Sequence, residues 1–180
     1  RENLKHLSSA LRHDTPVDDR ERDTARAVPA GYRISADSAD CDAARVHTWL
    51  SGDAYWALGR SREVMDRAIA ASEMWSVLSS ESSQGAEGAE EQVGVARVVT
   101  DGAIFAWLCD VYIDPSHRGR GLGSALVGVI VADLEARGIR RMLLATRDAH
   151  EVYAGHGFTA LADPGMWMER DRRDLRPSRG

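Results

Sequence analysis

Residues 111–138 constrain the fold of this chain more than any other segment. They predict a strand, a turn rich in arginine and glycine, and an amphipathic helix from Leu122 to Arg137 that ends at Gly138. The turn holds two arginines and three alternating glycines, in the order Arg118, Gly119, Arg120, Gly121, Leu122, Gly123. A helix N-terminus exposes unpaired N–H groups and the positive end of the helix dipole, and glycines let that backbone approach a ligand. The turn therefore favours a phosphate or pyrophosphate site over the simpler alternative of a solvated surface turn.

Two common glycine motifs do not fit this turn. A Walker loop ends in Gly-Lys followed by Ser or Thr, and no lysine stands here. The dinucleotide fingerprint requires a glycine at position 124, where the chain has Ser124. Nucleotide hydrolysis and dinucleotide binding of those types are therefore excluded.

Short strands and helices alternate along the rest of the chain. Strands are expected at residues 31–35, 75–79, 92–99, 104–113 and 142–146, with a final pair at 158–161 and 166–169. Helices are expected up to residue 50 from a cap at Asp37 or Ser38, over 62–72 from a cap at Ser61, and over 149–156. Asp101-Gly102 predicts a tight hairpin turn. Early hairpins and a late β-α-β crossover together predict an α/β domain with a mixed sheet.

The pattern of charge and glycine at the two ends sets the expected domain limits. Residues 1–29 are predicted to be a flexible N-terminal extension, in which Leu4, Leu7 and Leu11 have the spacing of a short helix. Residues 30–170 are predicted to form a single domain, and residues 171–180 a C-terminal tail. Within the domain, residues 80–91 read as a polar, low-complexity loop.

Composition narrows the class of protein. The chain is 43% hydrophobic with a net charge of −5, which argues against nucleic acid as the main partner. No apolar run is long enough to cross a membrane, and the first residues lack the layout of a secretion signal. Two cysteines cannot form a disulfide framework or a four-ligand zinc site. We therefore expect a cytoplasmic protein with no membrane or nucleic-acid partner. The single lysine, Lys5, lies in the predicted extension, which excludes a Schiff-base lysine in the core.

Two motifs at a fixed separation give the chain a family resemblance. Arg118, Gly121 and Gly123 fill Arg-x-x-Gly-x-Gly, which resembles the acetyl-coenzyme A motif of the GNAT superfamily of N-acetyltransferases. The strand end and turn that usually precede this motif are matched by Ile113, Asp114 and Pro115. The later segment A-x-x-x-Y-x-x-x-G-F is filled by Ala149, Tyr153, Gly157 and Phe158. The resemblance covers residues 31–169 in element order, and its specific motifs lie within 111–158.

The resemblance implies a fold and a co-substrate. The fold is a mixed, mostly antiparallel sheet whose central strands splay apart in a V, flanked by about four helices. The co-substrate is acetyl-CoA, with no metal. Residues implied to contact it are Val111, Tyr112, Ile113, Arg118, Gly119, Arg120, Gly121, Leu122, Gly123, Ser124, Thr146, Ala149 and Tyr153. Thr146 departs from the family pattern, which often has Asn there, but a hydroxyl can still donate and accept a hydrogen bond.

The resemblance also implies direct attack of an amine on the thioester carbonyl, through a tetrahedral intermediate. A strand N–H near Val111 would stabilise the oxyanion. Tyr153 is the candidate general acid for the departing thiolate, since a phenol and a thiol have unperturbed pKa values of about 10 and 8.5. The alternative for Tyr153 is a helix tyrosine whose ring packs on the core. The motif around it favours catalysis.

No residue is clearly marked as the base that removes the proton of the amine. Asp110, on the central strand, is the first candidate. Its alternative is a structural carboxylate that accepts hydrogen bonds, and a chain of waters could replace it as base. Asp148 is a weaker candidate, with a helix cap as its alternative.

The acceptor is expected to meet the first two helices and their connection. The candidate residues there are His47, Tyr55, Trp56 and Arg60. An aromatic ring could hold an amine by cation–π contact, but at least one of Trp49 and Trp56 is expected to fill the core instead. Cys109 is expected to be a small apolar residue rather than a nucleophile, and the spacing of His117 and His156 indicates no metal site.

The sequence thus predicts an acetyl-CoA-dependent N-acetyltransferase acting on the amine of a small molecule. A non-catalytic acyl-CoA sensor with the same fold stays open as an alternative, and so does an acetyltransferase that acts on a protein amine. A homodimer is a further possibility.

Overall fold

The computed structural model describes residues 27–80 and 90–171. The possible helix at Leu4 to Leu11, most of the predicted N-terminal extension, most of the polar loop and the tail from residue 172 lie outside the described residues.

In the described residues, five strands form one sheet in the order β1-β2-β3-β4-β5. They span Tyr32–Ser35 (β1), Glu73–Ser79 (β2), Glu91–Thr100 (β3), Phe105–Ile113 (β4) and Arg141–Leu143 (β5). Neighbours from β1 to β4 are antiparallel, whereas β4 and β5 are parallel. The predicted mixed, mostly antiparallel sheet is confirmed. The last strand is shorter than the predicted 142–146.

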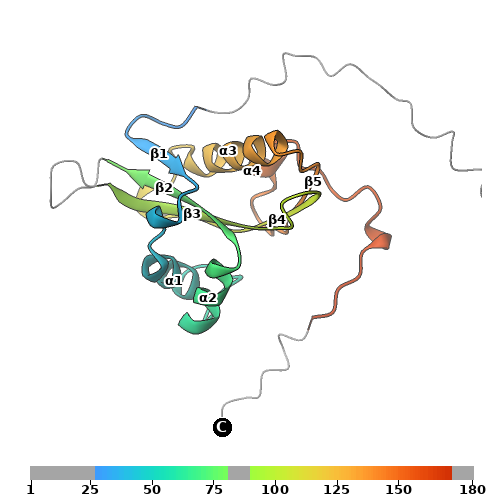
Figure 1. Ribbon diagram of the computed structural model, residues 1–180, viewed down its shortest axis with the longest axis horizontal. Coiled ribbons are helices and arrows are strands. Elements are labelled where there is room, and N and C mark those ends of the chain that lie inside the picture. Colours follow the sequence, from blue (N-terminus) through green and yellow to red (C-terminus); the bar gives the residue numbers. More distant parts are fainter. Residues whose placement is uncertain (1–26, 81–89, 172–180) are drawn as a thin grey trace, which may run out of the picture.

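Helices cover both faces of the sheet (Figure 1). α1 (Ala43–Gly52) and α2 (Arg62–Ala70) lie on one face, and α3 (Leu122–Ala136) and α4 (His150–Ala154) lie on the other. Ser61 caps α2 as predicted, because its hydroxyl accepts from the N–H of Val64 at 3.4 Å. Among the described residues, no helix has the length and apolarity needed to cross a membrane.

The start of α1 differs from the prediction because the chain has two caps in succession. Asp37 accepts from the N–H of Ala39 and caps only a short 3-10 turn. Asp42 then accepts from the N–H groups of Ala44 and Arg45, and α1 begins there. The predicted helix is therefore divided into a short 3-10 turn and α1, which begins after Asp42.

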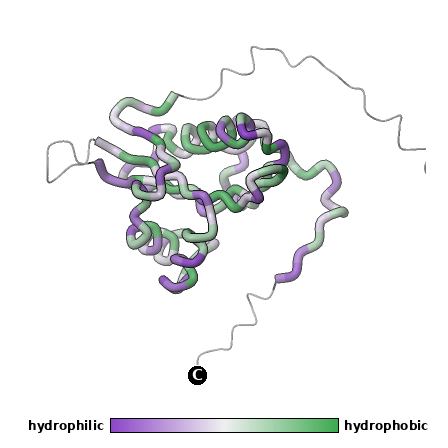
Figure 2. The backbone as a smooth tube through the Cα atoms, viewed as in Figure 1, coloured by the Kyte–Doolittle hydropathy of each residue, from purple (hydrophilic) through white to green (hydrophobic). Residues whose placement is uncertain are grey.

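α3 buries one apolar face against the sheet, and Figure 2 shows it as a mostly hydrophobic helix. Four side chains spaced four residues apart form that face, each at most 2% exposed: Leu122, Leu126, Ile130 and Leu134. The helix ends where Gly138 adopts a φ of 84° and the N–H of Ile139 donates to the carbonyl of Leu134. The predicted helix and its glycine stop are confirmed.

A β-bulge in β4 changes which face of the sheet its side chains reach. Val95 pairs with Tyr112 and Arg97 pairs with Cys109, so β4 has one more residue than β3 over this stretch. Asp110, inside the bulge, has a φ of 52°. Before the bulge, Leu108 packs in the cluster that holds α3, and after it Tyr112 packs in the cluster that holds α1 and α2. The bulge therefore turns Asp110 toward the α1–α2 face.

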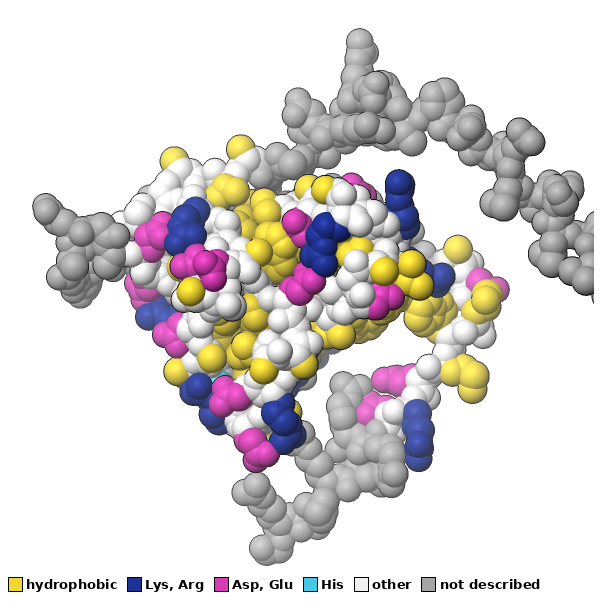
Figure 3. All heavy atoms as spheres, viewed as in Figure 1, with side chains coloured by type: hydrophobic (Ala, Val, Ile, Leu, Met, Phe, Trp, Pro, Cys, Tyr) yellow, Lys and Arg dark blue, Asp and Glu magenta, His cyan; other side chains and the backbone are white. Residues whose placement is uncertain are grey.

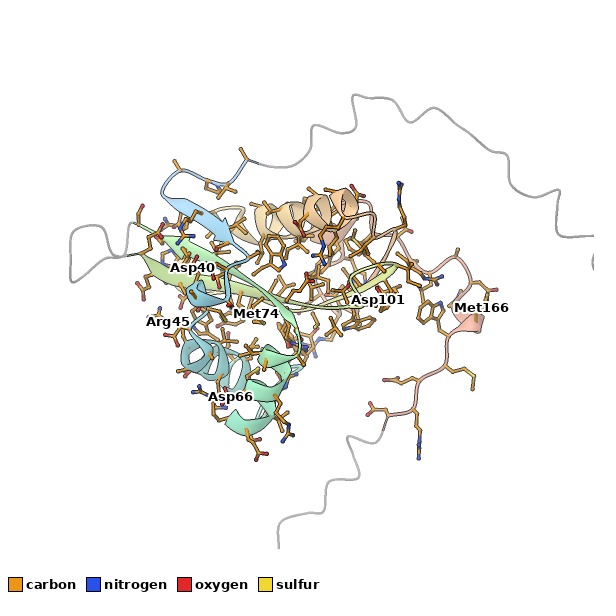
Figure 4. All side chains as sticks on the ribbon, viewed as in Figure 1. Asp40, Arg45, Asp66, Met74, Asp101 and Met166 are labelled. Atoms are coloured by element: carbon orange, nitrogen blue, oxygen red, sulfur yellow. The ribbon has the colours of Figure 1, made fainter. Side chains whose placement is uncertain are left out.

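The predicted final strand pair is wrong. Residues 158–161 and 166–169 form no strand, and a short 3-10 turn at Pro164–Met166 stands between them. Hydrophobic side chains line this segment where it leaves the body of the domain (Figure 3), and Figure 4 shows Met166 outside that body. Met166 is 79% and Met168 98% exposed. Runs of only four residues carry too little periodicity to predict pairing, and β5 offers an edge of three residues.

Candidate active site

A cavity opens where β4 and β5 stop pairing. The two strands pair only between Phe105–Trp107 and Arg141–Leu143, while β4 continues to Ile113. The space between the diverging segments, called here the central cavity, has a volume of about 330 Å³. It is lined by Tyr55, Trp56, Arg60, Arg97, Trp107, Leu108, Cys109, Asp110, Val111, Ala145, Thr146, Asp148, Ala149 and Tyr153. Its size and mix of aromatic and charged walls are typical of a site for a small molecule.

Asp110 is the most heavily bonded side chain in the central cavity. Its carboxylate is buried, and it accepts from Trp56 Nε1 at 3.0 Å on one oxygen. The other oxygen accepts from Arg97 Nε at 2.7 Å and from Arg60 Nη1 at 3.1 Å. Two guanidinium groups and an indole occupy its oxygens, so these contacts favour the structural alternative for Asp110 over the role of base.

Tyr153 packs on the core, as one of its two alternatives predicts, and it lines the central cavity as well. Its ring packs against the core and meets Phe158 edge-on, with ring centres 6.0 Å apart. Its side chain also lines the central cavity, and no hydrogen bond joins its hydroxyl to another described residue. Burial, with smaller contributions from Tyr55 and Asp148, raises the pKa of Tyr153 to about 12. The phenol is therefore a proton donor that stays protonated at neutral pH.

Cys109 also lines the central cavity, and its thiol is partly buried there. Burial raises the pKa of Cys109 to about 11, so its sulfur stays protonated at neutral pH and is a poor nucleophile. Its Sγ lies 3.4 Å from the carbonyl oxygen of Arg97. Burial therefore raises the pKa of both Cys109 and Tyr153 and disfavours their charged forms.

The glycine turn, residues 118–123, presents its backbone at the start of α3. Gly119 and Gly121 have φ values of 77° and 82°, in the region that L side chains rarely adopt. Gly121 is the N-cap of α3 and makes no side-chain capping bond, so no cap occupies the first N–H groups of the helix. A Cβ on Gly123 would only touch the side chain of Ile113, at 3.8 Å. The backbone conformation requires glycine at positions 119 and 121, whereas position 123 has room for a Cβ atom.

Both arginines of the glycine turn are held by the protein. Arg118 donates to the carbonyl of Ile113 at 2.8 Å and to Asp53 at 3.2 Å, and its guanidinium lies over the ring of Tyr112. Arg120 donates to the hydroxyl of Tyr32 at 2.7 Å. Arg118 therefore fixes the turn to β4 and to the end of α1, while the turn's backbone amides stay at the helix start.

The other predicted co-substrate residues take different positions. Leu122 lies in the core, so only its backbone can take part. Ser124 Oγ lies 2.9 Å from His156 Nε2. Val111, Thr146 and Ala149 line the central cavity, and Thr146 Oγ1 accepts from the N–H of Ala149 at 3.2 Å. Asp148 makes no capping bond to α4, which removes the alternative proposed for it.

Tyr112 points away from the central cavity, onto the face of α1. It stacks on Trp49 with ring centres 5.4 Å apart and donates to Asp53 at 2.7 Å. Burial and this hydrogen bond raise the pKa of Tyr112 to about 12, and the same bond, with Arg118, lowers the pKa of Asp53. Only the backbone of Tyr112 and Ile113 remains available to the role predicted for them.

Three of the four predicted acceptor residues meet in the central cavity. Tyr55, Trp56 and Arg60 line it, whereas His47 does not. His47 Nε2 instead lies 3.0 Å from the carbonyl oxygen of Arg60, so it anchors the connection between α1 and α2. The core packing expected of one tryptophan is confirmed by Trp49, which leaves Trp56 to the cavity.

Several side chains at this site were not predicted from the sequence, and three of them are polar or aromatic. Arg97 and Trp107 line the cavity, and the guanidinium of Arg147 lies 3.7 Å from the ring centre of Tyr55. A signal did exist for Arg97: it is a lone charge inside the apolar run 93–99, where a buried charge requires a partner. No group of three or more metal-ligating side chains that could hold an ion occurs among the described residues.

Comparison with known proteins agrees with this geometry. The profile of the acetyltransferase (GNAT) family matches residues 43–158. A solved structure from Xanthomonas campestris pv. campestris, assigned to the GNAT family, is 37% identical, with a TM-score of 0.70 over 82% of this chain and 97% of that one. Serotonin N-acetyltransferase 2, chloroplastic, of Oryza sativa subsp. japonica is 37% identical over 64% of this chain and 58% of that protein.

A histone acetyltransferase, TAP1 of Glycine max, is 38% identical over 43% of this chain and 35% of that protein. The chain spans about a third of the length of several of the curated relatives it matches. The family profile covers more than half of the chain, and the Xanthomonas structure is covered almost completely. The chain therefore belongs to the acetyltransferase (GNAT) family.

Proposed function

We propose that this protein is an N-acetyltransferase that transfers the acetyl group of acetyl-CoA to the amine of a small molecule. The observation that carries the proposal is the hydroxyl of Tyr153, which lines the central cavity without a hydrogen bond to any described residue. A protein that only bound the co-substrate would have no need of a proton donor there. Relatives named for histone and for serotonin differ in acceptor, so the family alone does not choose one.

The residues present fit acetyl-CoA. The uncapped N–H groups at the start of α3 and the left-handed glycines before them suit its pyrophosphate. Beyond Trp107, the edge of β4 that faces β5 has no strand partner among the described residues, which suits an extended arm that pairs with backbone. When bound, acetyl-CoA supplies an activated acetyl thioester. Tyr153 and the bulge residues Asp110 and Val111 all line the cavity.

The protein's own groups then have distinct tasks. The bulge leaves a residue of β4 outside the regular ladder, so a backbone N–H near Val111 is available to an oxyanion. Tyr153 protonates the departing sulfur, since burial keeps its phenol protonated at neutral pH and its hydroxyl lines the cavity without a hydrogen bond to any described residue. Because Asp110 already accepts three hydrogen bonds, two of them from guanidinium groups, we assign the removal of the amine proton to water in the cavity, with Asp148 as the second candidate.

The test is coenzyme A release with a panel of small amines, comparing the natural protein with Tyr153→Phe. Loss of a general acid lowers kcat by roughly 100-fold or more, while the KM for acetyl-CoA stays within about 3-fold. Val152→Ala, at the neighbouring exposed position of α4, is the matched control and retains full turnover. Turnover unchanged in Tyr153→Phe would remove the acid role. Tight acetyl-CoA binding without turnover of any amine in the panel would refute a small-molecule acceptor and favour a sensor or a protein acceptor.

A further inference from the structure

We propose that the acceptor amine also carries a carboxylate, and that Arg60 binds it. This inference rests on the proposed function and names the class of its substrate. Arg60 is in this view a specificity-determining residue of the central cavity. Its evidence is a charge imbalance among side chains that the bulge of β4 and the α1–α2 connection bring together.

The inner part of the cavity holds one more positive than negative charge. Arg60 and Arg97 share a single carboxylate, that of Asp110, whose side chain is 3% exposed. The two arginine side chains are 21% and 15% exposed, so solvent only partly compensates the surplus charge. A cavity that contains an uncompensated guanidinium attracts an anionic group more strongly than an open surface does.

The mouth of the cavity does not cancel this surplus. Asp148 lines the cavity but is exposed to solvent. Arg147, next to it in sequence, is exposed as well and lies over the ring of Tyr55. These two opposite charges balance each other in a screened environment. The unbalanced positive charge therefore lies on the inner wall of the cavity, which consists of Trp56, Arg60, Arg97 and Asp110.

Arg60 has more donors left for a ligand than Arg97, and it is the more exposed of the two. Arg97 bonds to Asp110 through Nε and to Ser72 through Nη1. Arg60 makes one side-chain hydrogen bond to the described residues, from Nη1 to Asp110, and four of its five N–H donors remain. His47 holds the backbone of Arg60 in place. A guanidinium fixed on one side and open on the other is suited to a carboxylate, which it can bind with two parallel hydrogen bonds.

The rest of the wall suits an apolar or aromatic body attached to that carboxylate. The rings of Tyr55 and Trp56 meet edge-on, with centres 4.9 Å apart, and Trp107 and Tyr153 also line the cavity. An amino acid with an aromatic side chain presents an amine, a carboxylate and a ring, and so matches all three features of the cavity. The matching amine without a carboxylate leaves the remaining donors of Arg60, those not bonded to Asp110, without an anionic partner.

The experiment compares kcat/KM for two matched pairs, phenylalanine with phenethylamine and tryptophan with tryptamine, each corrected for the fraction of free amine. Phenylalanine methyl ester adds a substrate of similar size without the charge. We expect the carboxylate to raise kcat/KM by roughly 10- to 100-fold in the natural protein. In Arg60→Gln this preference disappears, because the amino acids lose rate and the simple amines keep it. Arg62→Gln is the control, since Arg62 pairs on the surface of α2 with Asp66, which Figure 4 shows on the side away from the sheet.

Each other outcome overturns the inference in a distinguishable way. Equal or faster turnover of the simple amines would leave the proposed function standing and refute the carboxylate. Equal loss on both members of a pair in Arg60→Gln, with an unchanged melting temperature, would show that Arg60 acts only by holding Asp110. Absence of turnover on both members of each pair, together with turnover of another amine of the panel, would refute the inference alone. Absence of turnover on the whole panel, with acetyl-CoA still bound, would count against the proposed function, and the inference would fall with it.

Discussion

The glycine turn and the inner wall of the central cavity are built on different principles. The turn is made of consecutive residues, and what it offers a ligand is backbone: two glycines with positive φ and an uncapped helix start. The wall is made of side chains whose positions in the sequence are far apart, with Asp110 joined to Trp56 and Arg60 across 54 and 50 residues. One region depends on local conformation, and the other depends on the whole fold being correct.

This difference separates the two halves of the proposed function. A group that every family member must bind, such as the pyrophosphate of acetyl-CoA, can be recognised by backbone that does not vary with side-chain identity. The acceptor differs between members, so its recognition falls to side chains on exchangeable elements. Changes in the turn should therefore affect co-substrate affinity, and changes in the wall should affect stability and acceptor choice.

The largest expected effect is in the wall. Asp110→Asn leaves two partly buried guanidinium groups without a counter-charge, and breaking such a pair from one side lowers the free energy of unfolding by about 3 kcal/mol. Asn tolerates the positive φ of position 110, so backbone strain does not contribute. Unfolding in urea measures the difference.

The control for this variant is Asp66→Asn, which removes one partner of an exposed ion pair and costs less than about 1 kcal/mol. If Asp110→Asn kept its full stability and lost turnover, the structural role that we assign to Asp110 would be contradicted. Asp110 would then be the base, and its hydrogen bonds would position a proton acceptor.

The next effect is in the turn. Gly121→Ala forces a side chain into a left-handed conformation at a cost of about 1–2 kcal/mol, and relief of that strain displaces the N–H groups at the start of α3. We expect the Kd for acetyl-CoA to rise roughly 10-fold, measured by calorimetry, while the preference among acceptors stays unchanged.

Gly102→Ala is the matched control for this variant. Gly102 has a φ of 72° and open space around it. It lies in the β3–β4 connection, next to Asp101, which Figure 4 labels. It should lose similar stability and keep its affinity for acetyl-CoA. Equal weakening of binding in both variants would mean that the turn contributes through overall stability rather than through its backbone.

The same division explains what the sequence could predict. α3, its glycine stop, the hairpin of β3 and β4 and the cap of α2 depend on neighbouring residues, and all of them were predicted. The hairpin turn itself is longer than predicted, because Asp101 accepts from the N–H groups of Ala103, Ile104 and Phe105 instead of closing a two-residue turn. The local sequence thus predicted where the β3–β4 hairpin lies and did not predict the length of its turn.

The side chains of the wall depend on contacts that no local signal contains. The bulge at Asp110 reverses the face that the end of β4 presents, so strict alternation along the strand would have assigned Asp110 and Tyr112 to the face of Leu108. His47, an attractive candidate by residue type, points to a backbone carbonyl instead of the cavity. Residue type suggested which groups could act, and only the fold shows which of them meet.

The smallest expected effect concerns His156, which links the two regions. Its Nε2 contacts Ser124 at the start of α3, and its backbone N–H donates to the carbonyl of Tyr153. Burial lowers the pKa of His156 below the value of about 6.5 expected in the unfolded chain, so folding favours the neutral ring. The contribution to stability is complete above about pH 6.5 and is lost as the pH falls from there toward the lower pKa of the folded state.

His156→Gln keeps a polar side chain beside Ser124 and removes this titration. Unfolding measured from about pH 8 to about pH 5 should therefore show a shallower loss of stability in the variant than in the natural protein. The other described histidines, His47, His117 and His150, are common to both proteins and cancel in the difference. Parallel pH profiles would mean that His156 is charged as readily in the folded as in the unfolded chain. Loss of acetyl-CoA affinity on acidification in the natural protein alone would show that the junction of α3 and α4 transmits the change to the glycine turn.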